Sequence, residues 1–217
     1  MKHPNDFGLQ DVYSYETSDD LRNYYNDWAH AYDDFVTQTG YILPDKLADF
    51  IAENVQEHET MNVLDIGCGT GVLGKAIGDV LPNLVIDGID ISSSMLEIAR
   101  QAESTTGNKY YTTLYEADVT QSIPCLKDNY GLLVSTGTFT PGHLDCDHLF
   151  SFIPCLKQYG AAFVSVNKQH YIEMNFAEKI DQAQSSGVIA GFAYREVEAW
   201  ANENYSMKAM LLFFVKM

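Results

Sequence analysis

The sequence predicts an α/β protein built on a doubly wound, mostly parallel sheet with helices on both faces. Short apolar runs alternate with helical patterns along most of the chain, which is the order expected of parallel strands joined by crossover helices. The run at 130–136 is apolar without interruption, as in a strand that is buried on both faces. A glycine-rich turn follows the first apolar run directly, a combination typical of Rossmann-like folds.

Seven strands are expected. Apolar runs predict five of them, at 61–66, 84–90, 109–118, 130–136 and 161–167. The alternating patterns at 195–205 and 207–217 predict two more, which would close the sheet with an antiparallel C-terminal strand.

Six helices are expected between and before these strands. Their predicted ranges are 18–36, 44–57, from the glycine turn to about residue 80, 92–100, 145–157 and 169–185. Pro44 suits a first helical turn, and Ser94 with Glu97 has the spacing of a capping box.

The composition indicates an acidic, ordinary globular protein. The 217 residues include 13 Lys and Arg against 30 Asp and Glu, a formal net charge of −17, with no basic cluster. Such a charge disfavours nucleic acid as a partner, because binding to phosphates relies on Lys and Arg. No apolar run is long enough to span a bilayer, and no leader pattern is recognised, so we expect a cytoplasmic protein with reduced cysteines.

The chain has no repeat and no linker-like segment, so one compact unit is expected. Within it, residues 1–58 are interpreted as an N-terminal helical cap or lid and residues 59–217 as the Rossmann-like domain. The protein is expected to be a monomer or a homodimer.

The strongest motif is VLDIGCGTG at 63–71. The strand ends at Asp65, and glycines at Gly67, Gly69 and Gly71 let the chain turn tightly and bring its amides close to a ligand. The spacing of Gly69, Gly71 and Gly74 also satisfies GxGxxG, the weaker fingerprint of dinucleotide binding. A glycine turn that binds no ligand is the third interpretation.

Acidic residues end the next two strands, at Asp90 and Asp118. At the second strand end, a carboxylate accepts hydrogen bonds from the ribose of a bound nucleoside, in NAD proteins as in others. At the third, Asp118 is positioned to accept from an adenine amino group. Each acid alone would be an ordinary solvated residue or helix cap. Three acids at successive strand ends beside a glycine turn indicate a nucleoside site.

These motifs resemble a known family. VLDIGCGTG, DGIDISSSMLEIAR and YEADVT, within about residues 60–140, resemble the cofactor motifs of class I S-adenosylmethionine-dependent methyltransferases. YYNDWAHAYDDF and STGTFTPGHL further resemble the Williams–Beuren-region methyltransferase-like family. That family usually has an acid one position before Asn26 and commonly a His in place of Pro141.

The resemblance implies a cofactor, S-adenosyl-L-methionine, with S-adenosyl-L-homocysteine as its product. The glycine turn from Asp65 would surround the methionine portion, Asp90 the ribose and Asp118 the adenine edge. Tyr25, Trp28 and Tyr32 share one helix face, which either covers the cofactor or packs in the core. The full set of cofactor-binding candidates is Tyr25, Trp28, Tyr32, Asp65, Gly67, Cys68, Gly69, Gly71, Asp90, Ile91, Met95, Asp118, Val119 and Ser135.

Methyl transfer from a sulfonium needs a general base only when the acceptor carries a proton. His143, in the loop after the fourth strand, is the best-placed candidate, ahead of His30 and His170; a surface or structural role is the other interpretation. No motif suggests a metal site. The leading hypothesis is methyl transfer to a small-molecule acceptor. The alternatives are an NAD-dependent oxidoreductase and a non-catalytic, cofactor-binding partner subunit.

Overall fold

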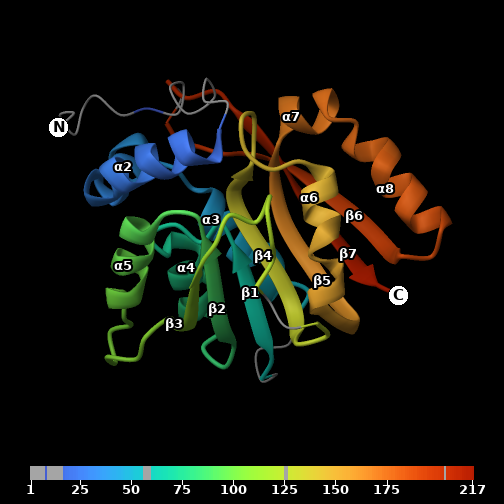
Figure 1. The fold of residues 1–217 in the computed structure, drawn as a ribbon, viewed down its shortest axis with the longest axis horizontal. Helices are drawn as coiled ribbons and strands as arrows, with labels where there is room; N and C mark the ends of the chain where they lie inside the picture. Colours follow the sequence, from blue (N-terminus) through green and yellow to red (C-terminus); the bar gives the residue numbers. More distant parts are fainter. Residues whose placement is uncertain (1–7, 9–16, 56–59, 125–126, 203) are drawn as a thin grey trace.

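The computed structural model describes residues 8, 17–55, 60–124, 127–202 and 204–217. A seven-stranded sheet in the order β3-β2-β1-β4-β5-β7-β6 forms its centre (Figure 1). The strands are β1 (Asn62–Ile66), β2 (Val85–Asp90), β3 (Tyr111–Glu116), β4 (Tyr130–Phe139), β5 (Leu156–Asn167), β6 (Ile189–Glu198) and β7 (Lys208–Lys216).

The predicted strand directions are confirmed. Strand β1 pairs in parallel with β2 and β4, and the parallel pairing extends to β3 on one side and β5 on the other. Strand β7 runs antiparallel to both of its neighbours, β5 and β6. The strand order reverses between β1 and β4, and in open α/β sheets a ligand crevice lies outside the carboxyl ends of strands at such a point.

Helices cover both faces of the sheet (Figure 1). They are α2 (Ser18–Thr39), α3 (Leu43–Ala52), α4 (Val72–Val80), α5 (Ser93–Gln101), α6 (Cys146–Ser151), α7 (Lys168–Glu173) and α8 (Phe176–Ser185). Apolar residues of α3, α4 and α5 form one buried cluster with the sheet, and those of α6 and α8 form a second. The predicted doubly wound architecture is therefore confirmed.

Helix α2 lies beyond the upper edge of the sheet, next to α5 (Figure 1). It begins at the N-cap Thr17, whose hydroxyl accepts the Asp20 N–H, and ends at Gly40 in the left-handed conformation. Its buried Tyr24 and Trp28 form a separate aromatic cluster, whereas α3 packs into the core of the sheet. The division of the chain into a cap of 58 residues and a Rossmann-like domain stays a prediction.

Several element ends differ from the sequence-based expectation. Helix α5 is capped by Ser92, whose hydroxyl accepts the Met95 N–H, so the capping box expected at Ser94 is wrong. Helix α6 ends at Ser151, six residues before the expected end, and a short 3-10 turn with Pro154 follows. A proline there removes an N–H donor and disfavours continued α-helix in the residue before it.

Two further differences lie near the C-terminus. The helix expected over 169–185 is divided at Asn175, which has a left-handed backbone with φ of 53°. Strand β6 begins at Ile189, earlier than the expected 195, and ends before Trp200. It occupies the edge of the sheet and is mostly solvent-exposed, so its sequence lacks a buried-strand pattern.

The cysteines do not all match the expected reduced state. Cys68 and Cys146 are buried free thiols, but Cys155 is disulfide-bonded, which corrects the expectation for that residue. Cys125 lies outside the described residues. No helix in the described segments combines the length and apolar character needed to cross a membrane.

Candidate functional site

A cavity of about 280 Å³ opens where the carboxyl ends of the parallel strands meet α2. We call it the edge cavity. Its lining comes from the glycine turn, the strand ends of β2, β3 and β4, and the helix above them. The lining residues are Thr17, Ser18, Leu21, Tyr25, Tyr32, Gly67, Gly69, Ile89, Asp90, Ile91, Met95, Ala117, Asp118, Val119, Thr120, Thr136, Gly137, Thr138, Gly142, His143 and Leu144.

The glycine turn provides the floor of the edge cavity. Gly67, Gly69 and Gly71 have φ values of 66°, 54° and 94°, a conformation that other residues rarely adopt. A Cβ at Gly69 would meet nothing within 4 Å, so the backbone there borders open space. A Cβ at Gly67 would lie 2.1 Å from Thr138 Oγ1, so packing also requires that glycine.

The GxGxxG spacing of Gly69, Gly71 and Gly74 has a structural explanation, because the last glycine is required by helix packing. Gly74, the last glycine of the GxGxxG spacing, donates its N–H to the Tyr111 hydroxyl over 3.2 Å. A Cβ at Gly74 would lie 2.3 Å from that oxygen. The residue therefore allows α4 to approach β3 closely, and it does not line the edge cavity.

Asp90 joins the glycine turn to the start of α5. Its Oδ2 accepts the Gly69 N–H over 2.8 Å, and its Oδ1 accepts the Ser92 N–H over 2.9 Å. Burial raises the pKa of this carboxyl, although the backbone hydrogen bonds from Ser92, Gly69 and Ile91 lower it. Each carboxylate oxygen keeps further acceptor capacity, so the arrangement fits the two hydroxyls of a ribose.

Asp65 and Ser135 lie behind the turn and do not line the edge cavity. Tyr111 donates its hydroxyl to Asp65 Oδ2 over 2.7 Å, and the other carboxylate oxygen is buried with no partner in the described part of the chain. Burial raises the pKa of Asp65 to about 7; the Tyr111 bond lowers it and the Asp90 charge raises it. Ser135 donates its hydroxyl to the Ile66 carbonyl over 2.7 Å. Ser135 therefore holds the start of the turn, and Asp65 is tied to β3 through Tyr111.

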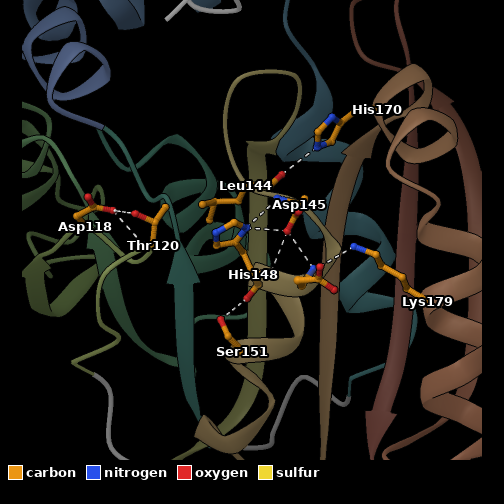
Figure 2. A network of polar contacts seen from close by, with 9 residues as sticks. Asp118, Thr120, Leu144, Asp145, His148, Ser151, His170 and Lys179 are labelled. Carbon is orange, nitrogen blue, oxygen red and sulfur yellow. Dashed lines mark hydrogen bonds and ion pairs between the residues drawn. The ribbon is translucent and has the colours of Figure 1, made fainter. Parts of the chain in front are cut away.

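At the other end of the edge cavity lie the residues expected near an adenine, Ile91, Met95, Asp118 and Val119. Asp118 accepts hydrogen bonds from the N–H and the hydroxyl of Thr120, at 3.0 and 2.6 Å (Figure 2). Burial alone would raise the pKa of Asp118, but these bonds and others lower it overall. The carboxylate is thus ionised and remains an acceptor.

The aromatic face of α2 divides into two parts. Tyr25 and Tyr32 line the edge cavity, together with Leu21. Trp28 is fully buried and packs edge-on against Tyr32 and Phe35, with ring centroids 4.9 and 5.0 Å apart. Tyr25 and Tyr32 therefore border the edge cavity as predicted, and Trp28 packs against both of their rings without lining it.

Polar contacts hold α2 in this position. Asn26 Oδ1 accepts the Ser92 hydroxyl over 2.7 Å and the Ser94 N–H over 3.2 Å, at the start of α5. Thr70, in the glycine turn, donates its hydroxyl to Asp33 over 2.6 Å. The helix is therefore tied to the same turn and helix that hold Asp90.

His143 lies in the loop after β4 and borders the edge cavity. Its Nδ1 is 3.1 Å from the Pro141 carbonyl, and its Nε2 is 2.8 Å from the Tyr25 hydroxyl. Because a carbonyl only accepts, Nδ1 carries the proton, and Nε2 accepts from Tyr25. Burial lowers the pKa of His143, and the neighbouring His170 lowers it too, while the Pro141 bond raises it. The ring is therefore a neutral base.

The other candidate bases are placed differently. His170 donates from Nε2 to the Leu144 carbonyl over 3.0 Å, which fixes the loop that carries His143 (Figure 2). Asp145 caps α6 just beyond, with its Oδ1 accepting the His148 N–H over 3.1 Å. His30 is exposed on α2. His170 thus positions the loop, and His143 alone of the three candidates borders the edge cavity.

Ten of the fifteen predicted site residues line the edge cavity, and Trp28, Asp65, Cys68, Gly71 and Ser135 lie outside its lining. The lining residues that were not predicted come from three places: the start of α2, the ends of β2 and β3, and the end of β4 with the loop after it. They are Thr17, Ser18, Leu21, Ile89, Ala117, Thr120, Thr136, Gly137, Thr138, Gly142 and Leu144. The small residues of STGTF at 135–139 were the available signal, because small side chains at a strand end leave room for a ligand.

The comparisons with known proteins identify the family. Residues 57–200 match a family described as a methyltransferase domain. The chain belongs to this family. Its seven-stranded fold agrees, and the chain is placed among the class I S-adenosylmethionine-dependent methyltransferases rather than the NAD-dependent dehydrogenases.

The relatives with similar sequences are methyltransferases named for different acceptors. Malonyl-[acyl-carrier protein] O-methyltransferase 1 of Ilyobacter polytropus is 30% identical over 148 residues, 67% of this chain and 52% of the relative. Ribosomal RNA small subunit methyltransferase C of Aliivibrio fischeri is 35% identical over 81 residues, 37% of this chain and 22% of the relative. The chain thus spans about half the length of the first relative and less of the second. The narrower Williams–Beuren-region resemblance stays a prediction.

Solved structures show the same fold. A complex between the Haloferax volcanii Trm112 methyltransferase activator and a methyltransferase matches with a TM-score of 0.64 at 15% identity, over 88% of this chain and 97% of that one. An S-adenosylmethionine-dependent methyltransferase of Methanococcus maripaludis matches with a TM-score of 0.59 at 18% identity, over 88% and 93%. At these identities the likeness concerns the fold alone.

Proposed function

We propose that this methyltransferase binds S-adenosylmethionine in the edge cavity and transfers its methyl group to a small-molecule acceptor. The observation that carries the proposal is the placement of Asp90. Its carboxylate is fixed by the Gly69 and Ser92 amides at the cavity wall, with acceptor capacity left for a ribose. Gly69 leaves open space beside it for the methionine portion. The residues present therefore fit the cofactor.

Other lining residues of the edge cavity would contact the adenine in this proposal. Ile91 and Met95 offer apolar surface for an adenine, and Asp118 offers an ionised acceptor for its amino group. The amide of Val119 would read the adenine edge. Thr136 and Gly137, at the end of β4, border the space nearest to His143, where the acceptor would meet the methyl group.

When bound, S-adenosylmethionine supplies a methyl group on a sulfonium, which an acceptor displaces in line. The chain's own contribution is positioning, exclusion of water and, for a protonated acceptor, removal of a proton. His143 is the base in this proposal, because it borders the edge cavity and its ring is neutral. Its Nε2 lone pair is occupied by the Tyr25 hydroxyl, which the acceptor would displace. The acceptor hydroxyl takes the place of the Tyr25 hydroxyl and donates directly to Nε2, so that its proton passes to that nitrogen as the acceptor oxygen is methylated.

A small acceptor is favoured over RNA by charge. The net charge of −17 opposes binding of a polyphosphate chain, and α2 covers the edge cavity with Leu21, Tyr25 and Tyr32 instead of a basic groove. A macromolecular acceptor would have to reach past this helix. We also infer a monomer or homodimer without nucleic acid or membrane partners.

A cytoplasmic location belongs to the same proposal. The free thiols of Cys68 and Cys146 support it, whereas the bonded Cys155 opposes it, since cytosolic thiols are normally reduced. Because Cys155 is buried, the location is tested by acid-quenching intact cells and labelling free thiols in the denatured protein. Full labelling of Cys155 supports the cytoplasm, and none supports an oxidising compartment.

The function is tested by calorimetry followed by turnover. Titration with S-adenosylhomocysteine should give micromolar-range binding, and NADH should give none. No heat at about 1 mM cofactor, equivalent to about −4 kcal/mol, would reject the cofactor assignment. A metabolite panel screened for S-adenosylhomocysteine release then separates an active enzyme from a non-catalytic binding subunit.

A further inference from the structure

A second cavity, of about 40 Å³, lies against the edge cavity. We call it the aromatic cavity. It shares Tyr25, Tyr32 and Gly137 with the edge cavity as common walls. Its lining residues are Tyr25, Tyr32, Phe35, Val36, Tyr41, Leu43, Gly137, Phe139, Thr140, Ser165, Asn167, Trp200, Met207 and Ala209. Six of these are aromatic, and none carries a charge.

One wall of the aromatic cavity is formed where the segment after α2 pairs with the segment after β6. Ile42 donates its N–H to the Ala199 carbonyl over 3.0 Å, and Ala201 donates to the Gly40 carbonyl over 2.8 Å. These bonds bring the Tyr41 and Trp200 rings to 5.0 Å between centroids. The wall is therefore built by backbone pairing and does not depend on a mobile side chain.

Two buried polar atoms of this lining, Thr140 Oγ1 and Trp200 Nε1, have no hydrogen-bond partner among the residues that the structure describes. Thr140 is 8% exposed and Trp200 6%. Asn167, in the same lining, is satisfied: it donates to Met207 Sδ and accepts the His170 N–H. Leaving a buried donor or acceptor unpaired is costly, so an unpaired pair in one cavity indicates a ligand that completes it.

From these observations we propose that the aromatic cavity is the acceptor subsite, selective for a small, uncharged, planar molecule with an oxygen that accepts from Trp200 Nε1 and pairs with the Thr140 hydroxyl. The proposal rests on the methyltransferase function and names its substrate class. An anionic group would find no Lys or Arg in the lining, and a cation would find no Asp or Glu to pair with. Planar rings suit the aromatic walls and the small volume.

The subsite is connected to the reaction point through the loop after β4. The His143 N–H donates to the Thr140 carbonyl over 3.1 Å, so the two residues belong to one turn. Gly137, exposed between the cavities, has a φ of 75°, and a Cβ there would meet only the Tyr41 hydroxyl, at 3.4 Å. A molecule held at Thr140 thus extends past Gly137 toward His143.

The test uses the full chain saturated with S-adenosylhomocysteine, after calorimetry has shown that the cofactor binds. Acetophenone and 4-hydroxyacetophenone are the neutral probes; benzoate and benzylamine are their charged counterparts. Binding is measured by ligand-observed NMR and by a thermal shift. Thr140→Val removes its unpaired hydroxyl at similar volume, and Trp200→Phe removes the unpaired indole N–H with a smaller ring. The control is Thr39→Val, because Thr39 lines neither cavity and its buried hydroxyl is bonded to the Phe35 and Val36 carbonyls.

We expect the neutral probes to bind and the charged ones to bind at least tenfold more weakly. Each cavity variant should lose about tenfold in probe affinity. The melting temperature of Thr140→Val should be unchanged or higher, because an unpaired buried hydroxyl is removed. That of Trp200→Phe should be lower, because ring packing against Tyr41 and Tyr205 is lost as well. Thr39→Val should lose stability and keep its probe affinity. Equal binding of charged probes, or affinities unchanged in both cavity variants, overturns the subsite. Failure of cofactor binding instead overturns the proposed function.

Discussion

The Tyr25 hydroxyl lies 2.8 Å from His143 Nε2, and this hydrogen bond joins α2 to the loop after β4. Neither residue is near the other in sequence, so the bond exists only when the helix covers the edge cavity. It also occupies the lone pair that a base would use. The same contact therefore links closure of the site to the state of its proposed base.

A pH dependence follows from His143. Burial holds its pKa below the usual 6.5, so the base is neutral at pH 7 and gains a proton only in more acidic solution. Turnover should be flat near neutrality and fall as pH drops through that lowered pKa. His143→Ala should reduce kcat by 10²–10⁴-fold for a protonated acceptor, the typical size of general-base catalysis.

Tyr25→Phe tests the partner of that base. Removing the hydroxyl takes away a donor that favours neutral His143, so the acidic limb of the kcat profile should move to higher pH. Profiles of the wild type and the variant, measured with the same acceptor, give the shift directly. An unchanged limb would show that another group titrates.

Asp90→Ala should weaken S-adenosylhomocysteine binding by about 2–3 kcal/mol, because the ribose loses a charged acceptor and the Gly69 and Ser92 amides lose theirs. Calorimetry measures the change. Asp79→Asn is the matched control, since it alters an acid that accepts from Tyr110 away from the edge cavity. Normal binding by Asp90→Ala would reject the ribose assignment.

Asp65 should make the fold less stable as pH rises. Its folded pKa of about 7 is above the ordinary 3.8, so the protonated carboxyl is the stable form in the fold. Its contribution is complete below pH 3.8 and is lost as pH rises through 7. Between pH 5 and 8 this corresponds to about 2–3 kcal/mol of unfolding free energy.

Urea denaturation of wild type and Asp65→Asn at pH 5 and pH 8 measures this contribution. In Asp65→Asn most of the difference in unfolding free energy between pH 5 and pH 8 should be lost. The control Asp87→Asn, which changes an acid that accepts the Tyr130 hydroxyl, should keep that difference. A wild-type protein equally stable at both pH values would show that Asp65 titrates normally. Asp90 shifts in the same direction and would account for a remaining part.

Local motifs allowed the cofactor side of the site to be predicted from sequence. The apolar runs predicted strand ends at Asp90 and Asp118; β2 does end at Asp90, whereas β3 ends at Glu116, two residues before Asp118. Parallel strands bring their carboxyl ends to one edge of the sheet, so both acids still reach the edge cavity. Which side chains of α2 line the edge cavity could not be predicted from the sequence. Helical periodicity places Trp28 and Tyr25 on one face, and only the packing shows that Trp28 is buried while Tyr25 lines the cavity. The aromatic cavity could not be predicted either, because Tyr41 and Trp200 are 159 residues apart in the sequence and are brought together by an isolated β-bridge.

Helix α2 should act as a lid whose closure depends on its polar anchors. Asn26 bonds Ser92 and Ser94, and Ser92 donates its N–H to Asp90, the proposed ribose ligand. Cofactor bound at Asp90 would therefore stabilise the segment that α2 rests on. We expect the amides of α2 to exchange more slowly with S-adenosylhomocysteine bound than without it, while those of α8, on another part of the sheet, exchange equally in both states.

The anchor variant Asn26→Ala makes the lid proposal specific. It removes two hydrogen bonds at the partly buried contact between α2 and α5, and each such bond contributes about 1 kcal/mol. Exchange of α2 should become faster, by about tenfold or more, and kcat should fall through loss of water exclusion. Thr37→Val, which removes a hydroxyl bonded only to the Asp33 carbonyl within α2, is the control and should leave closure intact. If α2 is ordinary core, its protection will be the same with and without cofactor, and Asn26→Ala will lower global stability without a selective effect on the helix.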